Sequence, residues 1–150
     1  MFDPDHLSIA PPFTTNSPPI ASAPDLRTLT SLNSLRGHVS AIYASYFFHL
    51  FAEDAQLRLA RALAGLLSPE PGSMIFGKQC GLPESGHLDV PSVLRRIFCH
   101  DPRSWSELWD GEVFPKGTVK VVAFVSEPPK DETYPELNTF LLLNWSVTRL

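Results

Sequence analysis

The sequence lacks several features, and each absence argues against a class of protein. No run of about 18 apolar residues occurs, so we expect no membrane-spanning helix and no membrane partner. The 12 lysine and arginine residues are outnumbered by 16 aspartate and glutamate residues and form no basic cluster, so we do not expect nucleic-acid binding. No basic segment followed by an apolar one marks the N-terminus, and we therefore expect a cytoplasmic protein.

Cysteine is equally scarce, since Cys80 and Cys99 are the only two. Two cysteines do not make a disulfide framework or a zinc site, and we interpret them as ordinary thiols. Asp3, Asp5 and His6 are residue types that bind metals, but their spacing is not distinctive. The sequence therefore predicts no metal site.

Proline, by contrast, is abundant and unevenly placed. Six of the 15 prolines precede residue 25, among serine, threonine and asparagine. This composition predicts an irregular arm over residues 1–24. Residues 25–150 are expected to form one domain, and an apolar content of 43% is enough for a core.

Residues 39–77 form the pattern around which we interpret the chain. Two apolar runs, Val39–Ser45 and Ser73–Gly77, are typical of strands buried in a parallel sheet. Between them, leucines recur at helical spacing, and Pro69, Pro71 and Gly72 end the helix predicted over Asp54–Leu67. The sequence therefore predicts a β-α-β unit with a right-handed crossover.

Two segments flank this unit. Residues 25–35 carry leucine at every third position, which favours a short helix, and Gly37 follows where a helix cap is usual. Residues 78–91 are rich in glycine, proline and serine and predict a long loop. Residues 93–98 fit a short helix or an extended segment equally well.

The last third of the chain predicts one more helix and two strands. Ser104 and Glu107 fit a capping box, so a helix is expected to start at Ser104. Val119–Val125 and Thr139–Thr148 are apolar runs separated by a proline-containing loop over residues 127–136, and such strands pair antiparallel. The order β-α-β-loop-α-β-β indicates an α/β fold, a partial Rossmann-like sheet of about four strands with an antiparallel edge.

Several stretches resemble the class I S-adenosylmethionine-dependent methyltransferases. They are IYASYFFHLF at residues 42–51, LLSPEPGSMIFG at residues 66–77, and FCH, SW and ELW between residues 98 and 109. The opening FDPD at residues 2–5 is similar to the segment after the third strand in that family. The resemblance is closest to fungal enzymes of terpenoid and meroterpenoid secondary metabolism. It implies S-adenosyl-L-methionine as cofactor and a small hydrophobic substrate, methylated at oxygen.

The resemblance also implies site residues. It places Ser45 and Tyr46 against the methionine part of the cofactor, and Met1 and Phe2 beside the adenine. His49 stands where related small-molecule O-methyltransferases carry a general base, a task that suits a neutral imidazole.

Two further residues are expected near the substrate. His100 lies in the loop expected to cover it, and Phe47 is a candidate wall of an apolar pocket. Each site residue also has an ordinary structural explanation: His49 as a packing residue near a helix start, His100 as a surface histidine, and the others as core or loop positions.

One family feature is missing from this sequence. The family binds the cofactor through a glycine-rich turn after its first strand and an acidic residue ending its second, yet no G-x-G occurs here. We therefore expect the C-terminal half of a methyltransferase, with the fourth to seventh strands, the last inserted before the sixth. The alternative is an inactive remnant that associates through the sheet edge exposed at Val39–Ser45.

Overall fold

The computed structural model describes residues 3, 5–20, 22–90, 95–128 and 140–150. Its elements, in chain order, are the 3-10 turns η1 (Leu26–Thr28) and η2 (Leu32–Leu35), strand β1 (Ala41–Tyr43), turn η3 (Phe48–Leu50), helix α1 (Glu53–Leu66), strands β2 (Met74–Gly81), β3 (Gly86–Val90) and β4 (Arg95–Cys99), helix α2 (Pro102–Trp109), and strands β5 (Val119–Ser126) and β6 (Leu141–Arg149).

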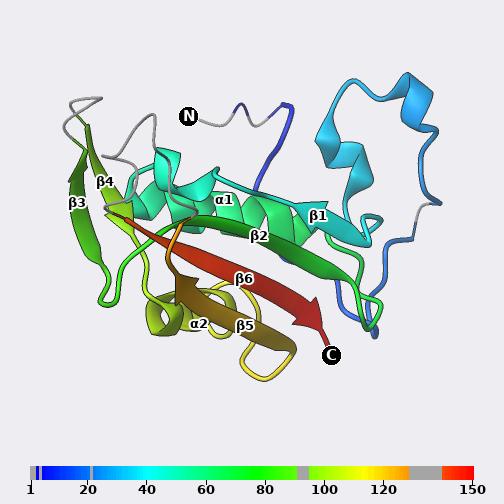
Figure 1. The fold of residues 1–150 in the computed structure, drawn as a ribbon. Coiled ribbons are helices and arrows are strands. Elements are labelled where there is room, and N and C mark those ends of the chain that lie inside the picture. The colour runs from blue at the N-terminus through cyan, green and yellow to red at the C-terminus, as the bar shows by residue number, and fades with distance from the viewer. Residues whose placement is uncertain (1–2, 4, 21, 91–94, 129–139) are drawn as a thin grey trace.

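Four strands form one mixed sheet in the order β1-β2-β6-β5 (Figure 1). β1 pairs parallel with β2, and α1 connects them. β6 lies between β2 and β5 and is antiparallel to both. The predicted fold class is confirmed, and the last strand lies before the preceding one, as the resemblance implies.

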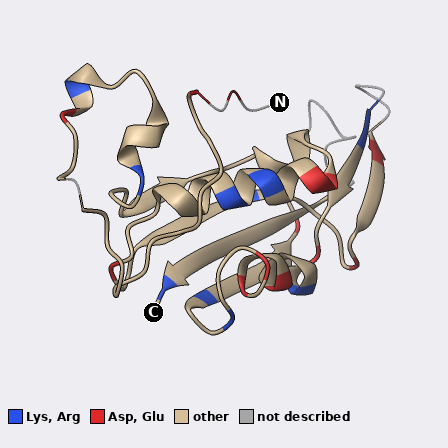
Figure 2. Cartoon of the chain, turned by 180° about the vertical axis from the view of Figure 1, so that it is seen from behind, with Lys and Arg blue, Asp and Glu red and all other residues tan. Residues whose placement is uncertain are grey.

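Both helices cover the same face of this sheet, as Figures 1 and 2 show from opposite sides. The strand residues that face them include Ile75, Leu143, Trp145 and Val147, all buried. α1 contributes a stripe of leucines and alanines, as its predicted periodicity requires. It ends at Leu66, and the turn that follows uses Gly72 at φ +90°.

Phe48 is the centre of the core. Its ring lies edge-on to three indoles, with centroids 5.0 Å from Trp105, 6.1 Å from Trp109 and 5.7 Å from Trp145. Because these residues come from η3, α2 and β6, one aromatic cluster joins three parts of the chain.

The predicted loop over residues 78–91 is wrong. β2 continues to Gly81 along its partner β6, and β3 pairs antiparallel with β4 as a separate hairpin. The loop was predicted from the glycine, proline and serine content of the segment, but the backbone of residues 78–81 pairs with β6. For residues 93–98 the extended alternative is correct in the described part, which belongs to β4.

The predicted helix over residues 25–35 is also wrong. Two separate 3-10 turns form there, because Asp25 and Ser31 each accept a hydrogen bond from a backbone N–H two residues on and so begin a new turn. The N–H of Leu32 donates to the carbonyl of His6 instead of continuing a helix. Leu26 is consequently 69% exposed, and the leucine spacing does not produce one apolar stripe.

The helix predicted to start at Ser104 begins at Pro102. Asp101 is the N-cap, and its carboxylate accepts hydrogen bonds from the N–H groups of Arg103 and Ser104. Ser104 is the other half of this capping box, because its hydroxyl accepts from the N–H of Asp101 at 3.1 Å. The helix has an apolar face formed by Trp105, Leu108 and Trp109, which are all buried.

β5 and β6 match the strands predicted at the end of the chain, and they pair antiparallel as expected. Most of the loop predicted over residues 127–136 lies outside the described residues, as does Thr139.

The arm predicted as irregular contains neither helix nor strand in its described residues, but it is held against the domain. The carbonyl of Ala10 lies so close to α1 that a Cβ at Gly65 would stand 3.1 Å from it. The guanidinium of Arg149 donates to the carbonyl of Phe13 and stacks on Phe114 at 4.9 Å. These contacts tie the arm to α1 and to the end of β6.

Candidate functional site

After β1, the backbone of residues 44–46 runs close alongside β2. The N–H of Ala44 donates to the carbonyl of Phe76 at 2.9 Å, and that of Tyr46 to the carbonyl of Lys78 at 2.7 Å. A Cβ at Gly77 would stand 2.1 Å from the carbonyl oxygen of Ala44. Only glycine permits this approach, so Gly77 fixes where the residues after β1 lie.

Tyr46 has φ +51°, the one positive φ of a non-glycine residue in the described part of the chain. Such a conformation costs free energy and is typical of functional sites. The residue is 45% exposed, and its ring lies 5.3 Å from the ammonium of Lys78. Beside it, the hydroxyl of Ser45 donates to the carbonyl of Lys78 at 3.4 Å.

His49 follows on η3 and faces the ring of Tyr46 edge-on, with centroids 6.3 Å apart. Its Nδ1 is buried and has no hydrogen-bond partner among the described residues. Burial lowers the pKa of His49, so the imidazole is neutral at neutral pH. A neutral imidazole with an unused ring nitrogen can accept a proton.

Phe47 lies between these polar residues and the core. Its ring lies edge-on to Phe51 at 5.3 Å and to the fully buried Phe48 at 6.4 Å. It is partly buried, so it is able to form part of an apolar wall at the end of β1.

His100 is 4% exposed and is therefore a buried residue, not a surface histidine. Its ring lies between Phe98 and Trp105, with centroids 5.0 and 5.1 Å away, and its Nδ1 is 3.0 Å from the hydroxyl of Ser104. Burial lowers the pKa of His100 to about 4, although the charge of Asp101 acts in the opposite direction. It is held as a neutral imidazole.

The residues around His49 and His100 are connected through buried groups. Trp105 contacts both Phe48 and His100. The side-chain amide of Gln56 donates to the carbonyls of Phe51 and Phe98, at 3.1 and 3.0 Å. α1, η3 and β4 therefore hold the two histidine segments in one framework.

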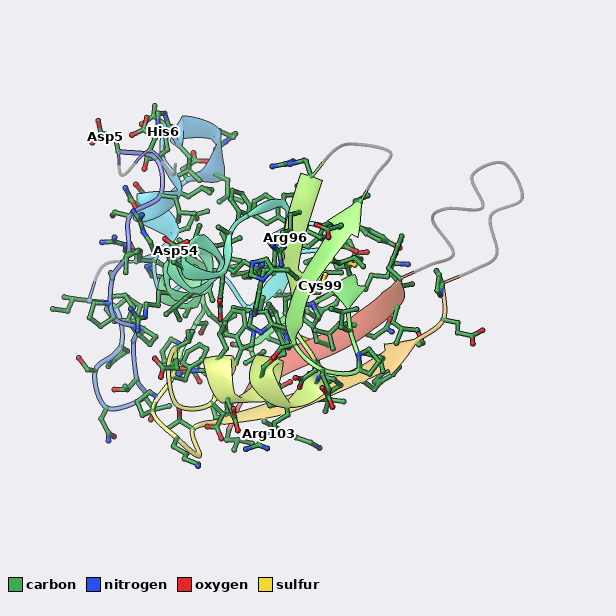
Figure 3. All side chains as sticks on the ribbon, turned by 90° about the vertical axis from the view of Figure 1, so that its left-hand side faces the viewer. Asp5, His6, Asp54, Arg96, Cys99 and Arg103 are labelled. Atoms are coloured by element: carbon green, nitrogen blue, oxygen red, sulfur yellow. The ribbon has the colours of Figure 1, made fainter. Side chains whose placement is uncertain are left out.

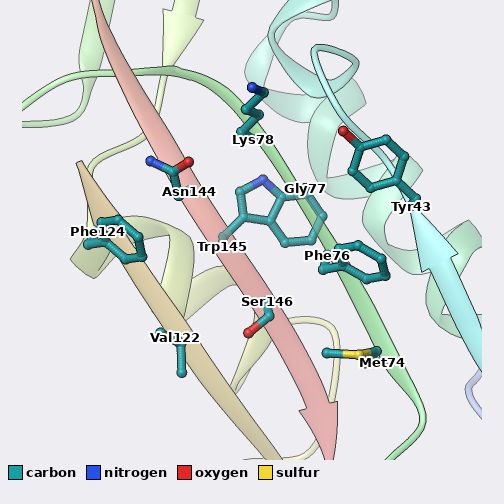
Figure 4. A pocket seen from close by; sticks show the side chains of 10 residues that line it. All are labelled: Tyr43, Met74, Phe76, Gly77, Lys78, Val122, Phe124, Asn144, Trp145 and Ser146. Atoms are coloured by element: carbon teal, nitrogen blue, oxygen red, sulfur yellow. The ribbon is translucent and has the colours of Figure 1, made fainter. Parts of the chain in front are cut away.

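The face of the sheet opposite the helices carries a shallow depression of about 490 Å³ (Figure 4). It extends from β1 to β5, and its lining includes Tyr43, Phe76, Lys78 and Phe124. Tyr43 is 65% exposed and Phe124 55%. Because Lys78 also contacts Tyr46, this open face adjoins the residues at the exit of β1.

A second depression, of about 480 Å³, lies beside His100 between the start of α1 and α2. Glu53, Asp54, Glu107 and Glu112 line it, so it has an acidic character. Within the described ranges, no group of three or more histidine, cysteine, aspartate or glutamate side chains is arranged to hold a metal ion. Asp5 and His6, which the sequence analysis named as residue types that bind metals, lie on the arm (Figure 3).

The structure thus brings Ser45, Tyr46, Phe47 and His49 together at the exit of β1, whereas Met1 and Phe2 lie outside the described residues. Lys78 was not singled out from the sequence, because it fell in the predicted loop. The only available signal was its place directly after the apolar run that ends at Gly77.

None of the helices in the described ranges combines the length and hydrophobicity needed to cross a bilayer.

Curated fungal proteins match this sequence, although no family model does. O-methyltransferase phiE from a fungal species is 36% identical over 87 residues, which are 58% of this chain and 29% of that protein. The Asnovolin E/Chermesin D methyltransferase nvfJ of Aspergillus novofumigatus is 39% identical over 80 residues, or 52% of this chain and 28% of nvfJ. Methyltransferase ausD of Penicillium brasilianum is 30% identical over 118 residues, or 77% of this chain and 42% of ausD.

The chain is a relative of fungal secondary-metabolite methyltransferases. The predicted resemblance is confirmed at this level. The matched segments cover less than half the length of each of these three methyltransferases. The chain therefore contains only part of what they contain, and its fold is a partial Rossmann-like one.

Proposed function

We propose that the chain is the C-terminal half of an S-adenosylmethionine-dependent methyltransferase that acts on a small hydrophobic metabolite, at oxygen. One observation carries the proposal: Ser45, Tyr46 and His49 meet at the carboxyl end of a parallel strand, with Tyr46 held in a strained conformation. Ligands of open α/β sheets bind at such ends. The order β1-β2-β6-β5 supports assignment to the fourth to seventh strands of the family's sheet.

The residues at the exit of β1 fit one end of the cofactor. The hydroxyls of Ser45 and Tyr46 and the ammonium of Lys78 suit the polar methionine end. Among the described residues lining the adjoining depression, none is acidic, so no carboxylate there would accept the ribose hydroxyls. We infer that this carboxylate and the glycine-rich turn come from a further segment, and that Met1 and Phe2 flank the adenine.

His49 then acts as general base. S-adenosylmethionine supplies the methyl group on a sulfonium, so the protein has to align the acceptor, exclude water and remove one proton. The neutral imidazole of His49 takes the proton from the acceptor hydroxyl. Phe47 forms an apolar wall beside it, and His100 contacts the substrate from the segment before α2.

Titration calorimetry tests this function. The 150-residue chain alone is expected to show no micromolar binding of S-adenosylmethionine. A fusion to the part of ausD that this chain does not match is expected to bind it and to methylate a phenolic or carboxylic acceptor. Micromolar binding by the chain alone would contradict the proposed incompleteness.

The role of His49 is tested in the same fusion. His49→Ala is expected to keep cofactor binding and to lose about 100-fold in turnover, the usual contribution of a general base. His87→Ala, which removes an exposed histidine from β3, is the control. Unchanged turnover and an unchanged pH profile in His49→Ala would exclude the base role.

A second candidate function is that of an inactive remnant that associates with another chain. It is favoured by β1, which pairs only with β2 in the described sheet, and by the exposed Tyr43 and Phe124 on the open face. Unpaired strand edges and exposed apolar patches bind other chains. A fusion that binds no S-adenosylmethionine, together with self-association of the chain, would favour this candidate.

A further inference from the structure

The two cysteines, distant in sequence, lie on neighbouring strands. Cys80 is the penultimate residue of β2, and Cys99 is the last residue of β4 (Figure 3 labels Cys99). A parallel bridge joins Gly81 to His100, and the N–H of Leu82 donates to the carbonyl of His100 at 3.2 Å. This register places Cys80 directly opposite Cys99.

The placement agrees with the Cα separation that a disulfide needs. Neighbouring strands lie about 4.7–4.9 Å apart, within the Cα separation of about 4.4–6.8 Å that disulfides need. Opposite residues of a parallel pair point to the same side of the sheet. Both thiols are buried and free, and they are hydrogen-bonded to each other.

We propose that Cys80 and Cys99 form a reversible intramolecular disulfide that fixes the β3–β4 hairpin to the main sheet. In the described structure β3 and β4 pair only with each other, so few backbone bonds join the hairpin to the main sheet. Apart from the bridge at His100, β4 is held by the bond from Gln56 to Phe98 and by aromatic contacts. The oxidant is a small disulfide of the oxidised-glutathione class.

The reaction proceeds by two exchanges. The thiolate of Cys80 attacks oxidised glutathione, forms a mixed disulfide and releases one glutathione. The thiolate of Cys99 then attacks the sulfur of Cys80, forms the protein disulfide and releases the second glutathione. In the protein two S–H bonds are lost and one S–S bond forms. The S–S bond of oxidised glutathione breaks, and its two sulfurs take up the two electrons and the two protons and leave as glutathione thiols.

The surroundings of the two thiols determine which of them reacts first. The hydrogen bond from Cys99 lowers the pKa of the Cys80 thiol, whereas the same contact and burial raise that of Cys99. Cys80 is therefore the attacking thiol and Cys99 the resolving one. Since both side chains are buried, the reaction waits for local opening of the hairpin, and we expect it to be slow.

The test measures the equilibrium of the pair with glutathione. The purified chain is incubated in mixtures of reduced and oxidised glutathione until equilibrium, free thiols are alkylated, and the products are counted by mass spectrometry. The equilibrium constant for disulfide formation gives the effective concentration of one thiol at the other. This effective concentration is measured in buffer and in 6 M guanidinium chloride, and the two values are compared. We expect it to be at least tenfold higher in buffer, because the fold holds the thiols together. An equal or lower value in buffer would overturn the proposal.

Two variants serve as matched controls. Cys80→Ser and Cys99→Ser are each expected to form only a mixed disulfide with glutathione. In the oxidised wild type, digestion is expected to yield a peptide linking Cys80 to Cys99, and protease cleavage within residues 82–98 is expected to slow at least threefold. Wild-type protein that carries only glutathione adducts, or that does not react at all, would contradict the disulfide.

Discussion

At the scale of single residues, Gly77 determines how the candidate site is assembled. Its missing side chain leaves the space taken by the carbonyl of Ala44, and this close approach places Ser45 and Tyr46. Gly77 is thus required for a backbone contact, although the residue has no chemistry of its own.

We predict that Gly77→Ala destabilises the protein by about 3 kcal/mol, because the new Cβ would overlap the Ala44 carbonyl and force β1 away from β2. Urea unfolding followed by fluorescence measures the change. Gly86→Ala is the control, since a Cβ there meets nothing within 4 Å. Equal unfolding midpoints for the two variants would contradict the close approach.

His100 makes stability depend on pH. Its pKa is lowered from an ordinary value of 6.5 to about 4 in the folded state, so between these values the unfolded chain binds a proton that the folded protein does not. We predict that the free energy of unfolding falls as pH drops from 6.5 to 4, by up to about 3 kcal/mol. The decline is expected to level off below pH 4.

The measurement is the urea midpoint from about pH 7.5 to 4, in wild type and in His100→Gln. The variant is expected to show a smaller slope but not a flat profile, because burial lowers the pKa of His49 as well and acts in the same direction. Identical slopes in both proteins would assign the pH dependence to other groups.

At the scale of elements, the start of α2 also anchors the turn before β3. The carboxylate of Asp101 accepts from Arg103 and Ser104 in the first turn of the helix, and from the N–H of Ser85 at 2.9 Å. One side chain therefore caps the helix and holds the β2–β3 connection.

We predict that Asp101→Ala costs about 2 kcal/mol, the upper end of the range for a lost N-cap, because the tie to Ser85 is lost as well. Asp101→Asn, which keeps an acceptor oxygen, is expected to lose less than half of this. Thermal unfolding of the three proteins makes the comparison. A full loss in Asp101→Asn would indicate that the charge matters more than the cap.

The elements that could be predicted from sequence are those with long apolar patterns. The leucine stripe of α1 and the apolar run of β6 require burial, and the structure buries them. The apolar run of β5 predicted a strand correctly, although Val122 and Phe124 are exposed. The β3–β4 hairpin was missed because its strands are short, pair only with each other and carry polar residues such as His87 and Asp89. The start of α2 was predicted too late in the sequence, because Ser104–Glu107 and Asp101–Ser104 both fit a capping box. Only the contacts in the structure show which of the two forms.

One part of the candidate site could likewise be predicted from the sequence, and another part could not. That residues 45–49 follow β1 could be predicted, because the order of the chain determines it. The left-handed conformation of Tyr46 could not, since it results from the contact with β2. Nor could the burial of His100, which depends on Phe98 and Trp105 closing over it.

At the scale of the whole molecule, one face of the sheet is covered and the other is open. α1 and α2 bury one side, while Tyr43, Val122 and Phe124 are exposed on the other. Two of the three strand pairs are antiparallel, and such sheets often leave one face open, but the apolar side chains gathered here form a patch of the kind that binds other chains.

We predict that the chain self-associates as its concentration rises and that Phe124→Glu weakens this association at least fivefold, by placing a charge in the apolar face. Sedimentation velocity over a concentration series provides the measurement. Asn16→Asp adds the same charge on the exposed arm and is the control. A monomer at all concentrations, or equal loss in both variants, would argue against the open face as the contact.

The bond between Arg149 and the carbonyl of Phe13 joins the last strand to the N-terminal arm. Amide hydrogens near residue 13 should therefore exchange with deuterium more slowly than those of a free arm, since this segment cannot leave the domain without breaking the bond. A tag appended after Leu150 would lie beside this bond, and an affinity handle is better placed elsewhere.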